Sequence, residues 1–148
     1  MRPATRSIDT IARTCIAVRL RLLNRVVTKL YDDALRPLGL KASQLNILIV
    51  TGRLGLARPA QVCDILQLDA STLSRNVKPL QVQGWVEVVP EDDARVQPIR
   101  LTPQGKRLIE KALPAWEEAQ RQATELLGDK TIALLDKAAR KAGMSQAD

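Results

Sequence analysis

The sequence predicts a mainly helical fold that carries one small β-hairpin. Apolar residues recur at helical spacing along most of the chain, and proline, glycine and capping residues divide this pattern into segments. Only two short runs alternate between apolar and polar residues as strands do. The chain has 148 residues, of which 45% are hydrophobic and 26% are charged, as expected for one compact domain.

The first predicted helix runs from about Ile8 to Ala34, and Pro37 and Gly39 end it. We expect the polar residues 1–7 to fray. The apolar stripe of this long helix needs more partner surface than one small domain offers, so part of it is expected to face a second subunit. The stripe contains Ile8, Ile11, Cys15, Ile16, Val18, Leu20, Leu22, Leu23, Val26, Val27 and Leu30.

Three shorter helices are predicted over about 43–52, 59–66 and 70–83. Asp69 is a good N-cap for the third helix. Pro79 lies inside that helix and predicts either a bend or an early end. The residues expected to face inward on the first two helices are Leu45, Leu48, Ile49, Val62, Ile65 and Leu66.

Two strands are predicted next, over 85–89 and 97–101, joined by the polar loop 90–96. Three short helices followed by a two-stranded hairpin is the order of a winged helix-turn-helix. Long helices flank this unit at both ends.

Two helices close the chain. Thr102 caps the first of them, which is expected to run to about Leu127 with a kink at Pro114. The second covers about 130–142. The residues expected to face inward on these two helices are Leu108, Ile109, Leu113, Trp116, Ala119, Ala123, Leu126, Ile132, Leu135 and Ala139.

The composition argues against several function classes. The formal net charge is +7 and the chain contains no His, so the commonest general base and zinc ligand is absent. We see no glycine-rich phosphate loop, metal-ligand cluster or nucleophile–base pair, and therefore expect neither an enzyme nor a cofactor. The basic surplus favours a polyanionic partner, and a chain with two Trp, one Tyr and no Phe fits duplex DNA better than single strands.

The chain carries no signal for a membrane or for secretion. No apolar run is long enough to span a bilayer, and arginines interrupt the apolar runs near the N-terminus, unlike in a signal peptide. We expect a cytoplasmic protein. Cys15 and Cys63 are isolated thiols, typical of small buried side chains rather than of a disulfide framework.

The predicted helix over 70–83 has two unlike faces. Leu73, Val77 and Leu80 share one face at about 100° per residue, which anchors the helix to a core. The other face carries hydroxyls that reach phosphates or base edges, and cations that pair with guanine. This face consists of Ser71, Arg75 and Lys78, with Thr72 and Ser74 at its margins. Together with the preceding helix and the following hairpin, this favours a DNA recognition helix over an ordinary amphipathic surface helix.

The tip of the hairpin contains Asp93-Ala94-Arg95. A carboxylate two residues before an arginine can hold the guanidinium in one orientation, and an arginine held in this way can enter a narrow minor groove. The alternative is a solvated loop with a weak surface ion pair. Glu91 and Asp92 add further acids, so plain electrostatic binding does not explain this tip, whereas a positioning role for Asp93 does.

Over about residues 8–142 the sequence closely resembles the MarR family of regulators, named for multiple antibiotic resistance. The matching residues are Leu38-Gly39-Leu40 with Gln44, Ser71-Thr72-Leu73-Ser74-Arg75, Gly84-Trp85-Val86, Asp93-Ala94-Arg95 and Leu101-Thr102-Pro103-Gln104-Gly105. The resemblance implies a winged-helix homodimer in which 1–36 is a dimerisation helix, 37–102 the DNA-binding lobe and 103–148 the C-terminal dimerisation helices. The expected dimer interface contains Ile8, Ile11, Cys15, Ala123, Leu126, Leu127, Ile132 and Leu135.

The resemblance also implies how the protein meets DNA. The polar face of the recognition helix enters the major groove, and Arg95, supported by Asp93, reaches the minor groove. Two-fold symmetry then predicts a pseudo-palindromic operator. Lys41 and Arg58 replace the Ser or Thr caps usual in the family. A phosphate offsets a cation at a helix N-terminus, so both are secondary DNA-contact candidates.

Members of the family usually repress transcription until a small phenolic or anionic effector binds between the dimer base and the DNA lobe. The resemblance implies such a ligand-responsive repressor here, and it implies a set of residues that line the effector pocket. The alternative is that these residues only pack in the core. These residues are Leu22, Val26, Tyr31, Ile47 and Trp116.

Two other functions stay open. One branch of the family senses peroxides through a cysteine near the start of the first helix, but Cys15 lies about two residues too far from Leu38, and the activating His and paired Tyr are missing. The second is a winged-helix module that docks proteins instead of DNA. Arg75, Lys78 and Arg95 on one predicted face argue against it.

Overall fold

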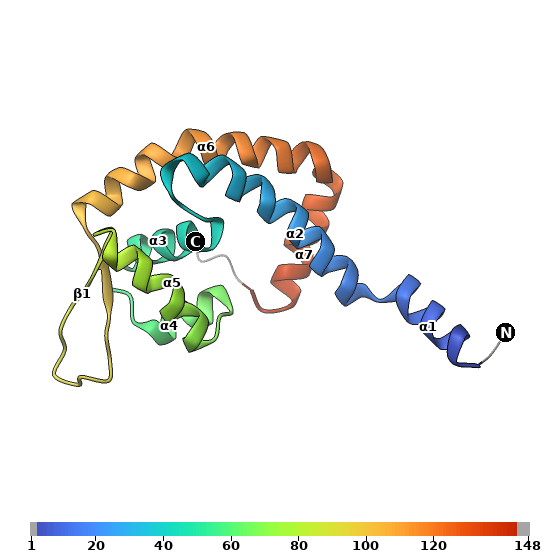
Figure 1. Cartoon of the computed structure of the whole chain (residues 1–148), viewed down its shortest axis with the longest axis horizontal. Coiled ribbons are helices and arrows are strands. Elements are labelled where there is room, and N and C mark those ends of the chain that lie inside the picture. Colours follow the sequence, from blue (N-terminus) through green and yellow to red (C-terminus); the bar gives the residue numbers. More distant parts are fainter. Residues whose placement is uncertain (1–2, 145–148) are drawn as a thin grey trace.

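The computed structural model describes residues 3–144. In chain order its elements are α1 (Pro3–Thr14), α2 (Ile16–Leu35), the 3-10 turn η1 (Arg36–Leu38), α3 (Ala42–Leu54), α4 (Pro59–Leu66), α5 (Ala70–Val82), β1 (Val86–Val88), β2 (Ile99–Leu101), α6 (Pro103–Leu127) and α7 (Asp129–Lys141). The long helices α2 and α6 lie side by side, and α3, α4, α5 and the hairpin form a lobe beneath them (Figure 1). The predicted mainly helical fold with one hairpin is confirmed.

The N-terminal helix differs from the prediction at its start and in its middle. Residues from Pro3 onward are helical rather than frayed, and the single helix expected over 8–34 is interrupted at Cys15, whose backbone is extended (φ −64°, ψ 109°). The hydroxyl of Thr14 donates to the carbonyl of Thr10 at 2.6 Å, a bond that weakens the helix just before the break. The sequence pattern does not predict this break, because the apolar stripe continues on both sides of it.

Two helices run unbroken through a proline. α5 continues past Pro79, so the alternative of an early end at this residue is wrong. α6 continues past Pro114 and arches over the lobe (Figure 1). Each proline removes one hydrogen bond from its helix. A buried side chain close to each proline, Leu80 on α5 and Ala112 on α6, still holds the helix against the core.

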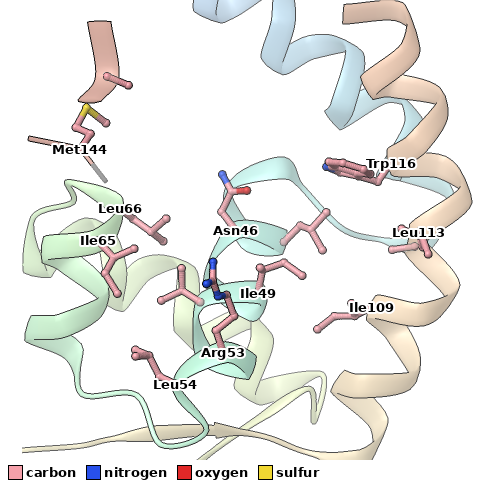
Figure 2. Close-up of a pocket in the computed structure, with 14 residues that line it drawn as sticks. Asn46, Ile49, Arg53, Leu54, Ile65, Leu66, Ile109, Leu113, Trp116 and Met144 are labelled. Carbon is pink, nitrogen blue, oxygen red and sulfur yellow. The ribbon is translucent and has the colours of Figure 1, made fainter. Parts of the chain in front are cut away.

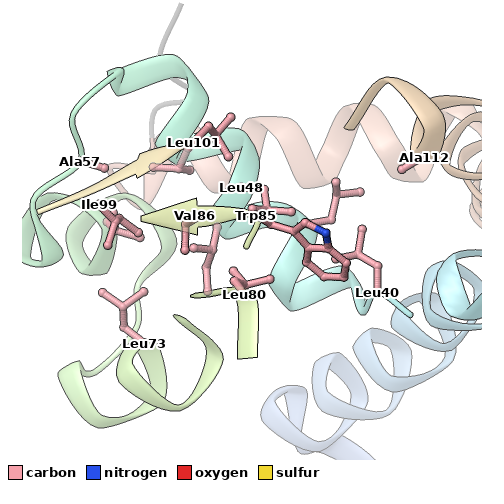
Figure 3. Packing of buried hydrophobic residues seen from close by; sticks show 14 of the residues in the cluster. Leu40, Leu48, Ala57, Leu73, Leu80, Trp85, Val86, Ile99, Leu101 and Ala112 are labelled. Carbon is pink, nitrogen blue, oxygen red and sulfur yellow. The ribbon is translucent and has the colours of Figure 1, made fainter. Parts of the chain in front are cut away.

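The core lies where α3, α4, α5 and the hairpin meet α6 (Figure 3). Ile49 and Ile65 were expected to face inward but are 40% and 45% exposed, because their sides of α3 and α4 line a cavity instead. The buried core consists of Leu35, Leu40, Leu45, Ile47, Leu48, Val50, Ala57, Val62, Leu73, Leu80, Trp85, Val86, Ile99, Leu101 and Ala112.

The hairpin, or wing, has short antiparallel strands of three residues each, fewer than predicted. Val89 still donates to the carbonyl of Pro98 at 2.9 Å, but Pro98 has no N–H to return, so the ladder ends. On the other edge, Ala57 and Ile99 exchange two hydrogen bonds of 2.8 and 2.9 Å, which fix the base of the wing to the segment before α4. The register pairs Val86 with Leu101, Glu87 with Arg100 and Val88 with Ile99.

The start of α6 is fixed against the short segment between α5 and β1. The hydroxyl of Thr102 accepts from the backbone N–H of Gly105 at 3.0 Å, forming the predicted N-cap, and donates to the carbonyl of Gly84 at 2.6 Å. A Cβ on Gly105 would lie 2.1 Å from the carbonyl oxygen of Trp85. Close approach of two backbone segments therefore requires glycine at this position.

The terminal helices leave apolar side chains uncovered in a single chain. Of the residues expected at a dimer interface, Ala123 is only 5% exposed and packs within its own chain, whereas Cys15, Leu127 and Ile132 are half-buried. The exposed apolar residues of α1, α2, α6 and α7 include Ile8, Ile11, Ile16, Leu20, Leu126, Leu134 and Leu135.

Candidate nucleic-acid interface

Asp69 organises the N-terminus of α5 as the predicted N-cap. Its Oδ1 accepts from the hydroxyl of Ser71 and from the backbone N–H of Thr72, both at 2.7 Å, and its Oδ2 accepts from the Thr72 hydroxyl at 2.9 Å. The bond from Ser71, followed by those from Thr72, lowers the pKa of Asp69 to about 2, because such bonds favour the charged carboxylate. Both hydroxyls already donate to Asp69, so they offer a ligand only lone pairs unless they leave the carboxylate.

Ser74, Arg75 and Lys78 form the outward face of α5, and all three are exposed. Arg75 makes two long hydrogen bonds, each of 3.4 Å, to the carbonyl of Ser71 and the hydroxyl of Thr72. Within residues 3–144 neither Arg75 nor Lys78 forms an ion pair. Two cations that form no ion pair among these described residues therefore face solvent from one helix.

The opposite side of α5 is held by the core and by a polar contact that the sequence did not indicate. Leu73 and Leu80 are buried, as predicted. The hydroxyl of Ser43 on α3 donates to the side-chain oxygen of Asn76 at 3.1 Å, and the amide group of Asn76 donates to the carbonyl of Thr72 at 2.9 Å. These contacts fix α5 against α3 with its cationic face outward.

At the tip of the wing, Asp93 holds the guanidinium of Arg95. The Nε of Arg95 donates to Oδ1 at 3.1 Å, its Nη2 to Oδ2 at 3.3 Å, and its backbone N–H to Oδ1 at 3.0 Å. These contacts hold the pKa of Asp93 below its ordinary value. The Arg95 side chain is still 91% exposed, so the pair adds little stability. What it provides is a guanidinium with a fixed direction.

Lys41 and Arg58 stand at the N-caps of α3 and α4. Neither side chain has an acceptor, so only half of each capping box forms: the side chains of Gln44 and Gln61 accept from the backbone N–H groups of Lys41 and Arg58, at 3.0 and 3.1 Å. The guanidinium of Arg58 pairs with Glu91 of the wing at 2.8 Å. Lys41 has no ion-pair partner in the described part of the chain.

A cavity of about 760 Å³ lies between the lobe and the C-terminal helices (Figure 2). Most of its lining is apolar, and its main polar groups are Asn46 and Arg53, both on α3. No ion pair involves Arg53 in the range 3–144. The cavity is lined by Leu45, Asn46, Ile49, Val50, Arg53, Leu54, Ile65, Leu66, Ile109, Ala112, Leu113, Trp116, Ala139 and Met144.

The five residues predicted to line an effector pocket have different surroundings. Only Trp116 lines this cavity. Ile47 is fully buried in the core, whereas Leu22 and Val26 are exposed on α2. Tyr31 is half-buried, which raises the pKa of its phenol. Which apolar residues border a cavity depends on how helices pack together, and spacing along one helix does not reveal it.

Neither thiol forms a disulfide. Cys15, at the break before α2, and Cys63, on α4, are both half-buried. Over residues 3–144 no group of His, Cys, Asp or Glu could hold a metal ion. In the same range, no helix combines the length and the hydropathy needed to cross a bilayer.

The family sequence model described as "MarR family" matches residues 38–95. The multiple antibiotic resistance protein MarR of Salmonella typhimurium is 29% identical over 90 residues, which are 60% of this chain and 62% of that protein. This chain thus spans less than two thirds of the length of the curated relatives it matches, 63% and 62% for the first two.

Two solved structures extend the similarity over most of the chain. The M. tuberculosis transcriptional regulator MOSR, solved in complex with DNA, is 32% identical with a TM-score of 0.71 and covers 86% of this chain and 98% of its own. A mutant MarR from E. coli, complexed with operator DNA, is 22% identical with a TM-score of 0.78 over 89% of this chain and 96% of its own, and shows the shared fold. Fold, motifs and relatives agree that the chain belongs to the MarR family of transcriptional regulators.

Proposed function

We propose that this protein binds double-stranded DNA as a homodimer, with α5 in the major groove and the wing in the adjacent minor groove. The observation that carries the proposal is a set of exposed cations. Arg75 and Lys78 on α5 form no ion pair within the described range 3–144, and Arg95 is held at the wing tip. An arginine pairs bidentately with guanine in the major groove, and a narrow minor groove attracts another. The relatives solved with DNA support the same function.

The other candidate contacts fall into ready and occupied groups. Ser74 and Lys41 are exposed and can bind phosphates directly. The hydroxyls of Ser71 and Thr72 already donate to Asp69, so each has to exchange that bond before it can donate to DNA. Arg58 donates to Glu91 through one nitrogen and keeps other N–H groups for a phosphate. We expect the occupied group to contribute less affinity for each contact made.

The homodimer is supported by the uncovered apolar residues of the terminal helices. Ile8 and Ile11 on α1 are exposed, as are Leu126 on α6 and Leu135 on α7. Their removal from water on association is favourable. A two-fold axis places two recognition helices about one turn of DNA apart. We therefore propose a pseudo-palindromic operator, at which the bound dimer represses transcription.

Replacing Arg95 by alanine should weaken binding to operator DNA about tenfold and reduce the slope of log K against log salt by about 1, because one cation that neutralises the charge of the phosphates lining the minor groove is lost. The free energy of unfolding should stay within about 0.5 kcal/mol, since the ion pair is exposed. Fluorescence anisotropy with labelled duplex and denaturant unfolding measure the two quantities.

The matched control is Arg121→Ala. Arg121 is also an exposed arginine paired with carboxylates, Glu118 and Glu125, but it lies on α6 rather than on the wing. The control should bind DNA like the wild type. Unchanged affinity of Arg95→Ala would remove the wing from the proposed interface.

We further propose that the cavity receives the small phenolic or anionic effector. Its apolar walls suit an aromatic or aliphatic body, and Arg53 supplies a guanidinium for a carboxylate or phenolate. The cavity borders both the lobe and α6, so a ligand there can favour one lobe spacing over another. Release of DNA then requires that it bind better to the spacing that does not fit the operator.

An aromatic carboxylate that fills the cavity should raise the Kd for operator DNA in the wild type, and its primary amide should not. Arg53→Leu should lose the response to the carboxylate while keeping the DNA affinity of the free protein. The measurement is a duplex titration with and without each compound. Equal responses to acid and amide, or an unaltered response of Arg53→Leu, would contradict the assignment of Arg53.

A further inference from the structure

The N-terminus of α3 is capped from outside its own helix. Lys41 occupies the N-cap position and has no acceptor in its side chain. The backbone N–H of Ala42, the first residue of the helix, instead donates to Oδ1 of Asp32 at 2.8 Å. Asp32 lies near the end of α2 and is half-buried. A carboxylate is also favoured at this place by the helix dipole.

The residue before Asp32 joins α2 to a different helix. The hydroxyl of Tyr31 donates to Oε1 of Gln120 on α6. Leu35, one turn further along α2, is fully buried in the core. The last part of α2 is therefore bonded to α6 through one side chain and to the start of α3 through the next.

From the start of α3 the contacts continue to the recognition helix. Ser43 follows Ala42 and donates to Asn76 at 3.1 Å, and Asn76 donates to the carbonyl of Thr72 at 2.9 Å. Successive hydrogen bonds thus link α2 through Asp32 to α3, and α3 to α5. Among residues 3–144, no other hydrogen bond joins a side chain of α2 to the backbone of the lobe.

We infer that Asp32 is a positioning residue for DNA binding, which sets the orientation of the lobe relative to the long helices α2 and α6. This inference rests on the proposed function. In a homodimer joined through the terminal helices, the spacing of the two recognition helices depends on how each lobe is held on α2. Asp32 acts through Ala42 and touches no DNA itself.

A plain stabilising role is the competing explanation, because capping of any helix stabilises a protein. The two roles separate in a double-mutant cycle with Lys41→Thr, which gives α3 a local cap. Lys41 is itself a candidate phosphate contact, so the effect of Asp32→Ala is measured both in the wild type and in the Lys41→Thr variant. Each comparison then holds residue 41 constant.

Asp32→Ala should weaken operator binding on the order of tenfold in both backgrounds. The local cap should restore the midpoint of thermal unfolding but not the affinity. The slope of log K against log salt should not change, because no phosphate contact is lost. Asp32→Asn, which keeps an oxygen acceptor, should bind like the wild type. Asp33→Ala, the matched loss of an exposed neighbouring carboxylate that pairs with Lys29 and Arg36, should stay within about twofold.

Recovery of affinity together with stability in the Lys41→Thr background would overturn the inference, as would full affinity of Asp32→Ala alone. Hydrogen exchange at the Ala42 amide tests the contact without DNA. Exchange should be slow in the wild type and in Asp32→Asn, and fast in both Asp32→Ala proteins; equal exchange in all of them would overturn the inference. A wild type that binds no duplex contradicts the proposed function, and the exchange result still decides whether Asp32 holds α3.

Discussion

Gly105→Ala should lower the free energy of unfolding by about 3 kcal/mol, although alanine normally stabilises a helix relative to glycine. The added Cβ would lie 2.1 Å from the carbonyl oxygen of Trp85 and 3.3 Å from the side chain of Leu101. Trp85 is buried, and its carbonyl accepts from the backbone N–H of Thr102 at 3.1 Å. The backbone segments at Trp85 and Gly105 cannot move apart without loss of this bond and of the adjoining N-cap of α6.

Gly52→Ala is the matched control, because Gly52 also lies inside a helix. Its Cβ would meet only the end of the Leu101 side chain, at 2.9 Å, which can change its rotamer. The free energy of unfolding should therefore change by less than about 1 kcal/mol. Urea unfolding of both variants gives the comparison. Similar stabilities of the two variants would contradict the close approach of the Trp85 backbone to α6.

Arg75→Ala should remove about 1–3 kcal/mol of discrimination at one base pair in each half-site. Arg75 is exposed on α5, and its hydrogen bonds to other described residues are both long, at 3.4 Å, so its guanidinium is available to a base. In selection from random duplexes, the bound sequences of the variant should lose their preference at that position and keep the preference at the others.

Lys78→Ala provides the contrast for Arg75→Ala. Lys78 lies on the same face of α5, but an ammonium group acts as a point charge toward phosphates. Its loss should weaken binding to all sequences about equally and leave the base preference unchanged. If Arg75→Ala behaved in the same uniform way, Arg75 would be a phosphate contact and not a reader of bases.

Local signals in the sequence predicted much of this fold. α4 begins at Pro59 and ends at Leu66 as predicted, and the N-caps at Asp69 and Thr102 form. Each of these features depends on residues within about one turn of a helix boundary. The break at Cys15 was not predicted, because apolar periodicity measures burial and continues across a change in backbone direction.

Contacts between distant segments account for most of what sequence reasoning missed. Asp32 caps α3 from another helix, and Glu91 of the wing pairs with Arg58. Neither pair has a regular spacing in the sequence, so no periodic pattern reveals it. The motif that ends in Gly105 was visible as part of a family resemblance, but its physical reason is the backbone of Trp85.

The candidate site was predicted in its outline and not in its hydrogen bonding. The spacing predicts that Ser71, Arg75 and Lys78 share one face, and all three are exposed. It places Thr72 at the margin of that face, and it could not show that the hydroxyls of Ser71 and Thr72 donate to the N-cap carboxylate. The residues that line the cavity were harder to predict, because residues such as Arg53 face a space formed by several helices.

The most direct test of the central claim is a titration of the purified protein with the duplex upstream of its own gene and with a scrambled duplex of equal length, at about 50 and about 200 mM salt. Sedimentation of the saturated complex gives the number of chains for each duplex. The account predicts two chains on the upstream duplex, tighter binding to it than to the scrambled one, and a steep loss of affinity as salt rises. Binding that is absent, or equal for both duplexes and insensitive to salt, would contradict it.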